Sequence, residues 1–241
     1  MRFVRSAAGS LLVASCCGGA WAGAGSVDAG APLIVDGRIH RVDLGAQGVA
    51  SDDASTVDTI RFTATTSGLH IIDLLSWEVV FHEHRHVSIY DLNGDGLHQF
   101  FDTEIHLFRD DGELGADDWI ESNGDSEFPH HDEDGAARHS SGGHQDGSVF
   151  EFDSFLRLRL EPGDYLLKVG AFFLSMDDAI DGLNDTSPFN VGHYPLAWDP
   201  ALEALVPAEF GSYRATIRLV PAPGAVAMYA LAGAAMIRRR R

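Results

Sequence analysis

The sequence predicts an all-β protein, a jelly-roll-like antiparallel β-sandwich with irregular loop insertions. Two observations predict this class. Short runs of β-branched, aromatic and other apolar residues alternate with turn-forming clusters of Gly, Pro, Asn, Asp and Ser along the middle of the chain. No stretch keeps a 3.6-residue apolar period long enough for a core helix, and only residues 176–183 and 199–205 have a briefly helical pattern.

The first half of the chain contains a series of short strand signals. Residues 33–35 and 38–44 flank Asp36-Gly37, a dipeptide typical of two-residue hairpin turns, so a hairpin is expected there. Further runs of strand-forming composition lie at 57–64, 70–75, 79–81, 87–90 and 105–108.

The second half contains the clearest hairpin signal. Residues 155–160 lead into Glu161-Pro162-Gly163-Asp164, and residues 165–173 return with strand composition. The last strand is expected at 213–220, where apolar and polar residues alternate. Two segments interrupt the pattern: the His- and Asp-rich loop 127–147 and an irregular excursion over 181–210.

The N-terminus has the pattern of a signal peptide. Arg2 and Arg5 precede a small apolar region, and Ala20-Trp21-Ala22 fits the small-x-small rule for cleavage, so signal peptidase is expected to cut after Ala22. Residues 13–16 also resemble a lipobox, whose processing would instead leave Cys16 acylated. The domain plan is therefore a signal peptide at 1–22, a β-sandwich at 23–219 and a C-terminal segment at 220–241.

Composition limits what the exported domain can be. The only cysteines are Cys16 and Cys17, so a chain that starts at Gly23 has no thiol for a disulfide, a nucleophile or a metal ligand. Removing the six arginines of the two ends takes the formal net charge from -19 to -25. Such a surface repels nucleic acid and anionic lipid and attracts divalent cations.

The C-terminal segment has the pattern of a temporary membrane anchor. It runs Val220-Pro221-Ala222-Pro223, then an apolar stretch over 224–237, then Arg238, Arg239, Arg240 and Arg241. The apolar stretch has about 14 residues, short of the ~20 that a stable spanning helix needs. Terminal arginines hold such a segment in the membrane from the cytoplasmic side. An ordinary short tail anchor is the alternative.

This tail resembles the PEP-CTERM sorting signal of Gram-negative surface proteins, with Ala222 where that family usually has Glu. The resemblance implies transient membrane anchoring and cleavage by an exosortase-type enzyme. It also implies a final location at the cell surface, in the outer membrane or in the extracellular matrix, with exopolysaccharide as a candidate partner.

The centre of the chain resembles bacterial pre-peptidase C-terminal domains over roughly residues 57–173. The order of pieces is shared: Asp102-Thr103 before an apolar strand, Asp111-Gly112, Asn123 with Asp125, Asp153-Ser154 before a strand, and Pro162-Gly163-Asp164-Tyr165. The resemblance implies a small, non-catalytic β-sandwich that binds calcium in some members.

A candidate calcium loop starts at Asp91. Asp91, Asn93 and Asp95 supply oxygens at positions 1, 3 and 5, Gly96 allows a sharp turn at position 6, and Asp102 occupies position 12. The sequence therefore predicts a calcium site at Asp91, Asn93, Asp95 and Asp102. The alternative is a plain β-turn, for which Asn-Gly-Asp-Gly is equally suitable.

His82-Glu83-His84-Arg85-His86 matches the zinc-peptidase motif H-E-x-x-H, which requires a helix to bring both end histidines to one metal. The flanking residues favour a strand, in which His82 and His86 would be ~13 Å apart. His84 and His86 could then form only an H-x-H half-site for zinc. The loop His130-His131 with its neighbouring acids is a further candidate for loose metal binding, with a flexible linker as the alternative.

The leading expectation is a non-enzymatic, calcium-stabilised protein of the cell surface. The alternatives are a secreted zinc metallopeptidase that uses residues 82–86, and a carbohydrate-binding module in which Trp77, Trp119 and Trp198 form a platform for sugar stacking.

Overall fold

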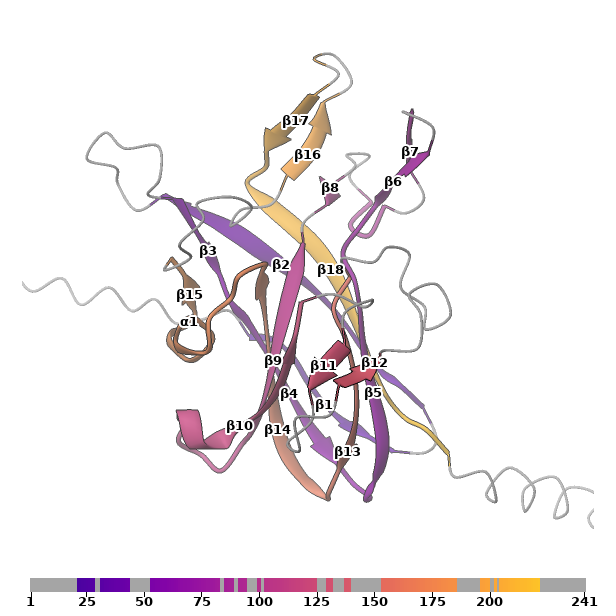
Figure 1. Ribbon diagram of the computed structural model, residues 1–241, viewed down its shortest axis with the longest axis vertical. Helices are drawn as coiled ribbons and strands as arrows, with labels where there is room; N and C mark the ends of the chain where they lie inside the picture. The colour runs from indigo at the N-terminus through magenta and orange to yellow at the C-terminus, as the bar shows by residue number, and fades with distance from the viewer. Residues whose placement is uncertain are drawn as a thin grey trace, which may run out of the picture.

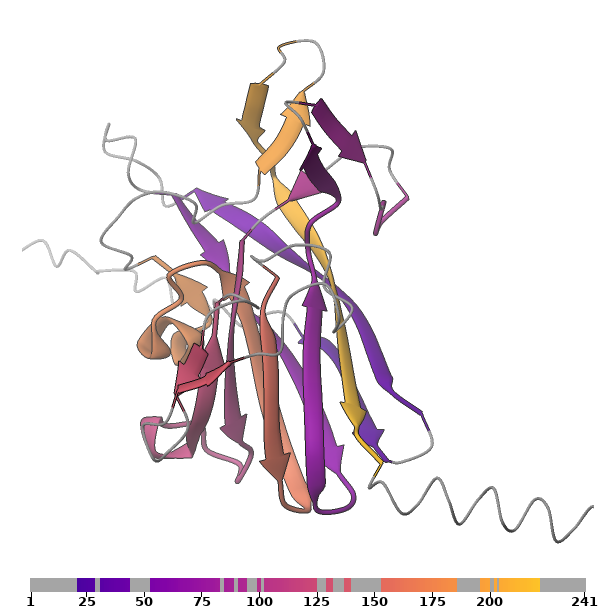
Figure 2. The same cartoon turned by 45° about the vertical axis from the view of Figure 1, so that its right-hand side comes forward.

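The computed structural model shows two large β-sheets packed face to face, so the predicted all-β sandwich is confirmed (Figures 1 and 2). The structure describes residues 21–28, 31–43, 53–82, 85–88, 91–94, 99–100, 102–124, 129–131, 137–139, 153–185, 196–199, 202 and 204–221.

The first sheet has five strands in the order β1-β4-β14-β9-β10. Their bounds are β1 (Trp21–Val27), β4 (Asp58–Ala64), β14 (Gly163–Ala171), β9 (Thr103–Arg109) and β10 (Trp119–Asn123). The edge strand β1 runs parallel to β4, whereas the other neighbours are antiparallel. The predicted antiparallel sandwich therefore has one parallel pair of strands at this edge.

The second sheet has six strands in the order β13-β5-β18-β2-β3-β15, and its neighbours are all antiparallel. Their bounds are β13 (Phe155–Leu160), β5 (Gly68–Leu75), β18 (Phe210–Leu219), β2 (Leu33–Asp43), β3 (Asp53–Thr56) and β15 (Leu183–Asn184).

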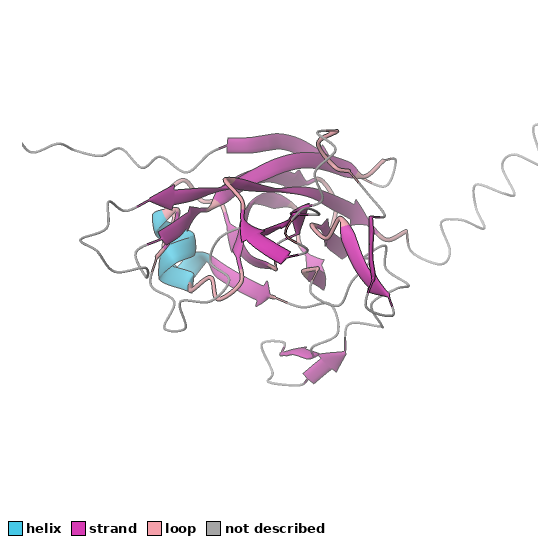
Figure 3. Ribbon diagram, turned by 90° about the horizontal axis from the view of Figure 1, so that it is seen from above, coloured by secondary structure: helices cyan, strands magenta, loops and turns pink. Residues whose placement is uncertain are grey.

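Smaller elements surround the sandwich. β17 (Ala204–Pro207), β16 (Leu196–Asp199) and β8 (Gln99–Phe100) form a three-stranded sheet. It lies at the upper end of Figure 1, together with the hairpin of β6 (Val79–His82) and β7 (Arg85–Ser88). The helix α1 (Met176–Asp181) lies to one side of the strands in Figure 3, and the 3-10 turn η1 (Ala116–Asp118) precedes β10. The helical prediction for 176–183 is thus confirmed.

The core lies between the two sheets, because each sheet buries every second side chain. Fully buried residues from both sheets meet there, among them Ile60, Phe62, Leu167, Ile72 and Ile217. Both cysteines of the chain precede β1, so no disulfide can form within the sandwich. Its stability comes from such burial, at about 25 cal/mol for each Å² of apolar surface removed from water.

The predicted hairpin at Asp36-Gly37 is wrong, because β2 continues straight through it. Gly37 pairs with Tyr213 of β18, and a Cβ on Gly37 would fall inside the Tyr213 ring. The glycine therefore makes room for a fully buried aromatic ring rather than for a turn.

The segment 155–173 also departs from its predicted hairpin. β13 pairs with β5 in the six-stranded sheet, whereas β14 pairs with β4 and β9 in the other sheet. The turn at 161–162 is thus a corner between the two sheets, and the Tyr165 hydroxyl ties it by donating to the Glu161 carbonyl at 2.7 Å.

Two other local predictions need correction. Residues 199–205 are predicted to be helical, but they belong to the hairpin of β16 and β17. On its other side, β16 pairs with β8. Part of the His-rich loop 127–147 forms a short hairpin of β11 (Pro129–His131) and β12 (Ala137–His139). In the first case, strand pairing within the hairpin and with β8 overrides weak local helix propensity.

No helix within the described ranges is long and apolar enough to cross a membrane. The predicted anchor at 224–237 lies outside those ranges.

The contact between Gly37 and Tyr213 generates a testable prediction. Gly37→Ala should destabilise the protein by about 1–3 kcal/mol, because the added methyl group forces the buried ring or the strand to shift. Gly124→Ala is the matched control, since its Cβ would have ordinary contacts at 3.5 Å. Urea unfolding of the full chain measures both; equal losses in the two variants would contradict the packing role of Gly37.

Candidate functional site

One buried carboxylate fixes both ends of the predicted calcium loop. Glu78 is fully buried just before β6 (Val79–His82). Its Oε1 accepts a hydrogen bond from the Leu92 N–H and its Oε2 accepts one from the Gln99 N–H, both at 2.7 Å. The Glu78 N–H in turn donates to the Gln99 carbonyl at 3.1 Å. The loop from Leu92 to Gln99 is therefore closed at its base by a single side chain.

The head of this loop is a tight turn. Asp91 Oδ1 accepts a hydrogen bond from the Gly94 N–H at 2.7 Å, and Gly94 has a φ of 71°. A left-handed residue at this point favours glycine. This geometry suits both the calcium loop and the plain β-turn that the sequence left open.

Two of the other three predicted calcium ligands are described. Asn93 is half-buried in the loop, and Asp102 is half-buried directly before β9. Asp95 lies outside the described residues. Within the described ranges, no three or more His, Cys, Asp and Glu side chains come together in a group that could hold a metal ion.

The Asp-Ser and Asp-Thr pairs noted in the sequence meet in a buried polar network. The fully buried Asp153 accepts hydrogen bonds from both the N–H and the hydroxyl of Ser76 at 2.8 Å. The Ser154 hydroxyl contacts the Thr103 carbonyl at 2.6 Å and the Thr103 hydroxyl at 2.9 Å. Asn123 Oδ1 accepts from the Phe155 N–H at 3.2 Å. These residues join β5, β9, β10 and β13, so they hold the sandwich together.

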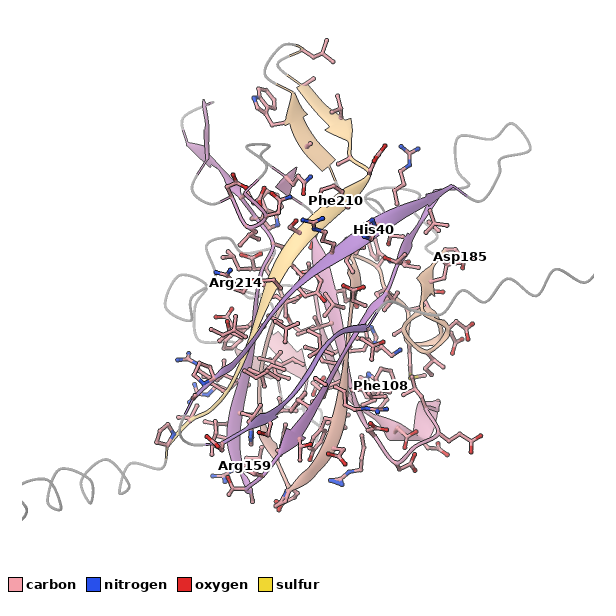
Figure 4. The ribbon with its side chains drawn as sticks, turned by 180° about the vertical axis from the view of Figure 1, so that it is seen from behind. His40, Phe108, Arg159, Asp185, Phe210 and Arg214 are labelled. Atoms are coloured by element: carbon pink, nitrogen blue, oxygen red, sulfur yellow. The ribbon has the colours of Figure 1, made fainter. Side chains whose placement is uncertain are left out.

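A pocket of about 420 Å³ opens beside the loop. Its lining residues come from β2, from the loop and from β18: Asp36, Gly37, Arg38, Leu92, Asn93, Ser212 and Tyr213. Arg38 lies over the Phe210 ring at 4.8 Å, and Arg214 forms an ion pair with Asp36 at 2.7 Å on the outer side of the same strands (Figure 4).

Asp58 is a buried carboxylate behind this pocket. Its Oδ2 accepts hydrogen bonds from the Tyr213 hydroxyl at 3.0 Å and from the Arg38 N–H at 3.2 Å, and the residue is 2% exposed. Burial raises the pKa of Asp58 to about 6, although both hydrogen bonds act in the opposite direction. Burial and the neighbouring Asp58 also raise the pKa of Tyr213 well above its ordinary value.

The zinc-peptidase motif does not form a helix. His82 ends β6 and His86 lies in β7 (Arg85–Ser88), and these strands form an antiparallel hairpin in which His82 is opposite Arg85. The expected separation of ~13 Å along one strand is therefore also wrong, because the chain reverses between the two histidines. His84 lies outside the described residues, so the H-x-H half-site for zinc stays a prediction.

The aromatic platform of the carbohydrate-binding alternative is not formed. Trp77 is only 6% exposed, so it belongs to the core. Trp119 is 40% exposed in β10, whereas Trp198 lies in β16 at the opposite end of the molecule in Figure 1.

The predicted processing sites flank the sandwich. Ala22 lies in β1, so cleavage after it would leave Gly23–Val27 of that strand. At the other end, the Val220 N–H donates to the Leu69 carbonyl at 2.8 Å, and Pro221 is exposed. Pro223 and the arginines at 238–241 lie outside the described residues.

Glu78 and Asp58 are the residues that the sequence analysis missed. The available signal for Glu78 was a lone acid between Trp77 and an apolar strand. Asp58 gave a similar signal, since it follows Val57 and starts a strand with three buried apolar residues.

No protein-family model matches the sequence, and no curated protein matches it. Among solved structures, the chain is similar to the pre-peptidase C-terminal domain of a collagenase from Bacillus anthracis, with 9% identity, 81% of this chain and 94% of that chain covered, and a TM-score of 0.30. CorA, a surface-associated copper-binding protein of Methylomicrobium album BG8, has 13% identity, coverages of 83% and 99%, and a TM-score of 0.32. A protein of Sulfurospirillum deleyianum has 9% identity, coverages of 79% and 98%, and a TM-score of 0.27. Similarities this weak define neither a family nor a function for this chain.

The raised pKa of Asp58 generates a prediction about pH. Folded protein binds this proton more tightly than unfolded protein, so the stabilisation is present below pH 3.8 and is lost as the pH rises through about 6. Asp58→Asn does not titrate. The free energy of unfolding of Asp58→Asn, taken relative to that of the parent, should therefore rise by up to about 3 kcal/mol between pH 4 and pH 7.5.

Urea unfolding of the full chain at the two pH values measures this difference. The exposed Asp117→Asn is the control and should show no such trend. A constant difference between Asp58→Asn and the parent across this range would contradict a titrating, buried Asp58.

Proposed function

We propose that this chain is a non-enzymatic, exported protein of the bacterial cell surface or extracellular matrix, built around one calcium-stabilised β-sandwich. The observation that carries the proposal is the position of the fold between its processing signals. The last strand ends at Leu219, and the segment that resembles a sorting signal starts at Val220. The first strand starts at Trp21, within the predicted cleavage site.

The hydrogen bonding of the buried polar residues supports a non-catalytic role. Glu78, Asp153 and Ser154 all bond to backbone or neighbouring hydroxyl groups that hold strands and loops in place. A general acid or base needs a position that reaches substrate. The β6–β7 hairpin, moreover, replaces the helix on which the zinc-peptidase motif depends.

The geometry of residues 91–94 is compatible with calcium as the stabilising ion. The turn is closed by Asp91 and Gly94, and Glu78 fixes its base from outside the proposed ligand set. The proposed ligands are Asp91, Asn93, Asp95 and Asp102, whose hard oxygens suit this cation. Calcium bound there would offset part of the repulsion within a chain of net charge -19.

Sorting through the C-terminal segment is the second part of the proposal. After export, an exosortase-type enzyme would cleave near Val220-Pro221-Ala222-Pro223 and remove the apolar stretch with its arginines. The last strand ends at Leu219 and Pro221 is exposed, so the proposed cleavage would lie directly beyond the fold. Retention at the surface of a Gram-negative cell, within an exopolysaccharide matrix, would follow.

The calcium site predicts a metal-dependent stability. Calcium at ~100 times its Kd should stabilise the full chain by about 2.7 kcal/mol, which corresponds to a rise in Tm of roughly 5–10 °C for a domain of this size. Asp91→Ala should abolish that rise. Thermal unfolding in calcium and in chelator measures it.

Asp111→Ala is the matched control, because Asp111 Oδ1 accepts from the Glu113 N–H at 3.2 Å in a similar turn next to Gly112, away from the proposed site. This variant should keep the calcium response. A parent protein whose Tm is the same in calcium and in chelator would contradict the proposed site.

The sorting proposal predicts a shortened C-terminus. Mass spectrometry of the protein released from the surface of the producing cell should show that Arg238–Arg241 and the apolar stretch are missing. Replacing Pro221 and Pro223 with Ser should leave the tail attached. Soluble, secreted protein that still ends in four arginines would overturn the proposal.

A further inference from the structure

The outer face of the six-stranded sheet gathers arginines. Leaving the six arginines of the two ends out of the total of 17 leaves eleven basic side chains. Five of them lie on this face, since they alternate with the core residues of β13, β18 and β2. This basic face is defined by Arg38, Arg157, Arg159, Arg214 and Arg218. Figure 4 labels Arg214 and Arg159 along this side of the molecule.

Most of these charges are available to a partner. Arg38, Arg157, Arg159 and Arg218 are exposed, and within the described ranges only Arg214 has a carboxylate at ion-pair distance, that of Asp36. Half-buried Leu69 and Ile71 lie between the arginine positions of β13 and β18, and Ile34 on β2 is 55% exposed. Arginine interspersed with apolar side chains is typical of protein interfaces rather than of a merely solvated surface.

The opposite side of the sandwich is acidic. There α1 packs on the outer face of the five-stranded sheet through a second apolar cluster that includes Phe108, Leu166 and Ala179, and η1 lies next to α1. The acidic face is defined by the exposed acids of α1, of η1 and of the turns after β9 and β15: Asp111, Glu113, Asp117, Asp177, Asp181 and Asp185. The nearby Arg61 is already paired with Asp110 at 2.6 Å.

We propose that the basic face of one copy of this protein binds the acidic face of a second copy. Guanidinium groups bind carboxylates bidentately and lose less hydration than lysine would. Because the two faces lie on opposite sides of the sandwich, an assembly of bound copies keeps a free basic face at one end and a free acidic face at the other. Such a heterologous contact does not close on itself and extends into chains of molecules.

A second copy suits the basic face better than an anionic polymer, because the matching acids are present on the same molecule in a comparable number. The net negative charge of each copy opposes association. At physiological ionic strength, however, charges more than ~8 Å apart are largely screened, whereas contacting pairs are not. The proposal requires neither calcium nor tail processing, so it can fail independently of the proposed function.

The test compares two charge-reversed variants of the full chain, purified in detergent because of its apolar tail. The first reverses the basic face with Arg157→Glu, Arg159→Glu and Arg218→Glu. The second reverses the acidic face with Asp117→Lys, Asp181→Lys and Asp185→Lys. Light scattering after size exclusion measures mass against protein concentration and salt, and circular dichroism confirms that each variant is folded.

The parent should grow in mass with concentration at 0.1 M salt and return to the monomer at 1 M salt. Each variant alone should stay monomeric, and an equal mixture of the two should associate again. Net charge cannot explain such a recovery, because both variants remain negatively charged overall.

Three outcomes would overturn the proposal: a monomeric parent at all concentrations, association that survives reversal of either face, and a mixture that stays monomeric. A monomeric parent that binds a polyuronate, with binding lost only in the first variant, would assign the basic face to an anionic polysaccharide instead.

Discussion

Buried carboxylates that accept hydrogen bonds from backbone N–H groups are the interaction on which this sandwich depends. Glu78 binds the N–H groups of Leu92 and Gln99, Asp153 binds that of Ser76, and Asp58 binds that of Arg38. At each of these points a strand ends or lacks a neighbour, so the N–H group would otherwise be buried without an acceptor. Leaving such a donor unsatisfied costs about 1–3 kcal/mol, which is a large part of the stability of one domain.

This arrangement explains how a strongly acidic sandwich, whose chain has cysteines only before β1, can fold and why its inner acids do not indicate catalysis. The oxygens of these acids are directed at the backbone. The pKa of Asp58 is raised to about 6, because burial disfavours its charged form more than its two hydrogen-bond donors favour it. The surfaces that we propose to be functional therefore lie in the loops and on the two outer faces of the sandwich.

The sequence predicted the class of fold because alternation of apolar residues is a local signal, visible in β4, β9 and β18 without knowledge of their neighbours. The sequence could not predict which strands pair or which residues pack against each other. Asp36-Gly37 has the composition of a turn, and only the ring of Tyr213, 176 positions away from Gly37, requires a glycine within a strand. Residues 155–171 have the pattern of a hairpin, yet their strands belong to different sheets. Within the candidate site, the roles of Asp91 and Asn93 as calcium ligands rest on spacing alone and stay a prediction, whereas Glu78 was missed because a single buried acid has no periodic signature.

We propose that Glu78 holds the loop from Leu92 to Gln99 closed and that calcium binds within a loop already fixed at its base. Hydrogen exchange of the Leu92, Gly94 and Gln99 amides, in calcium and in chelator, tests it most directly. We expect the Leu92 and Gln99 amides of the parent protein to be protected from exchange in both conditions, and this protection should be lost in Glu78→Gln. Calcium should add protection only to amides between these two residues, such as that of Gly94. Rapid exchange of Leu92 and Gln99 in the parent protein, with or without calcium, would contradict the account.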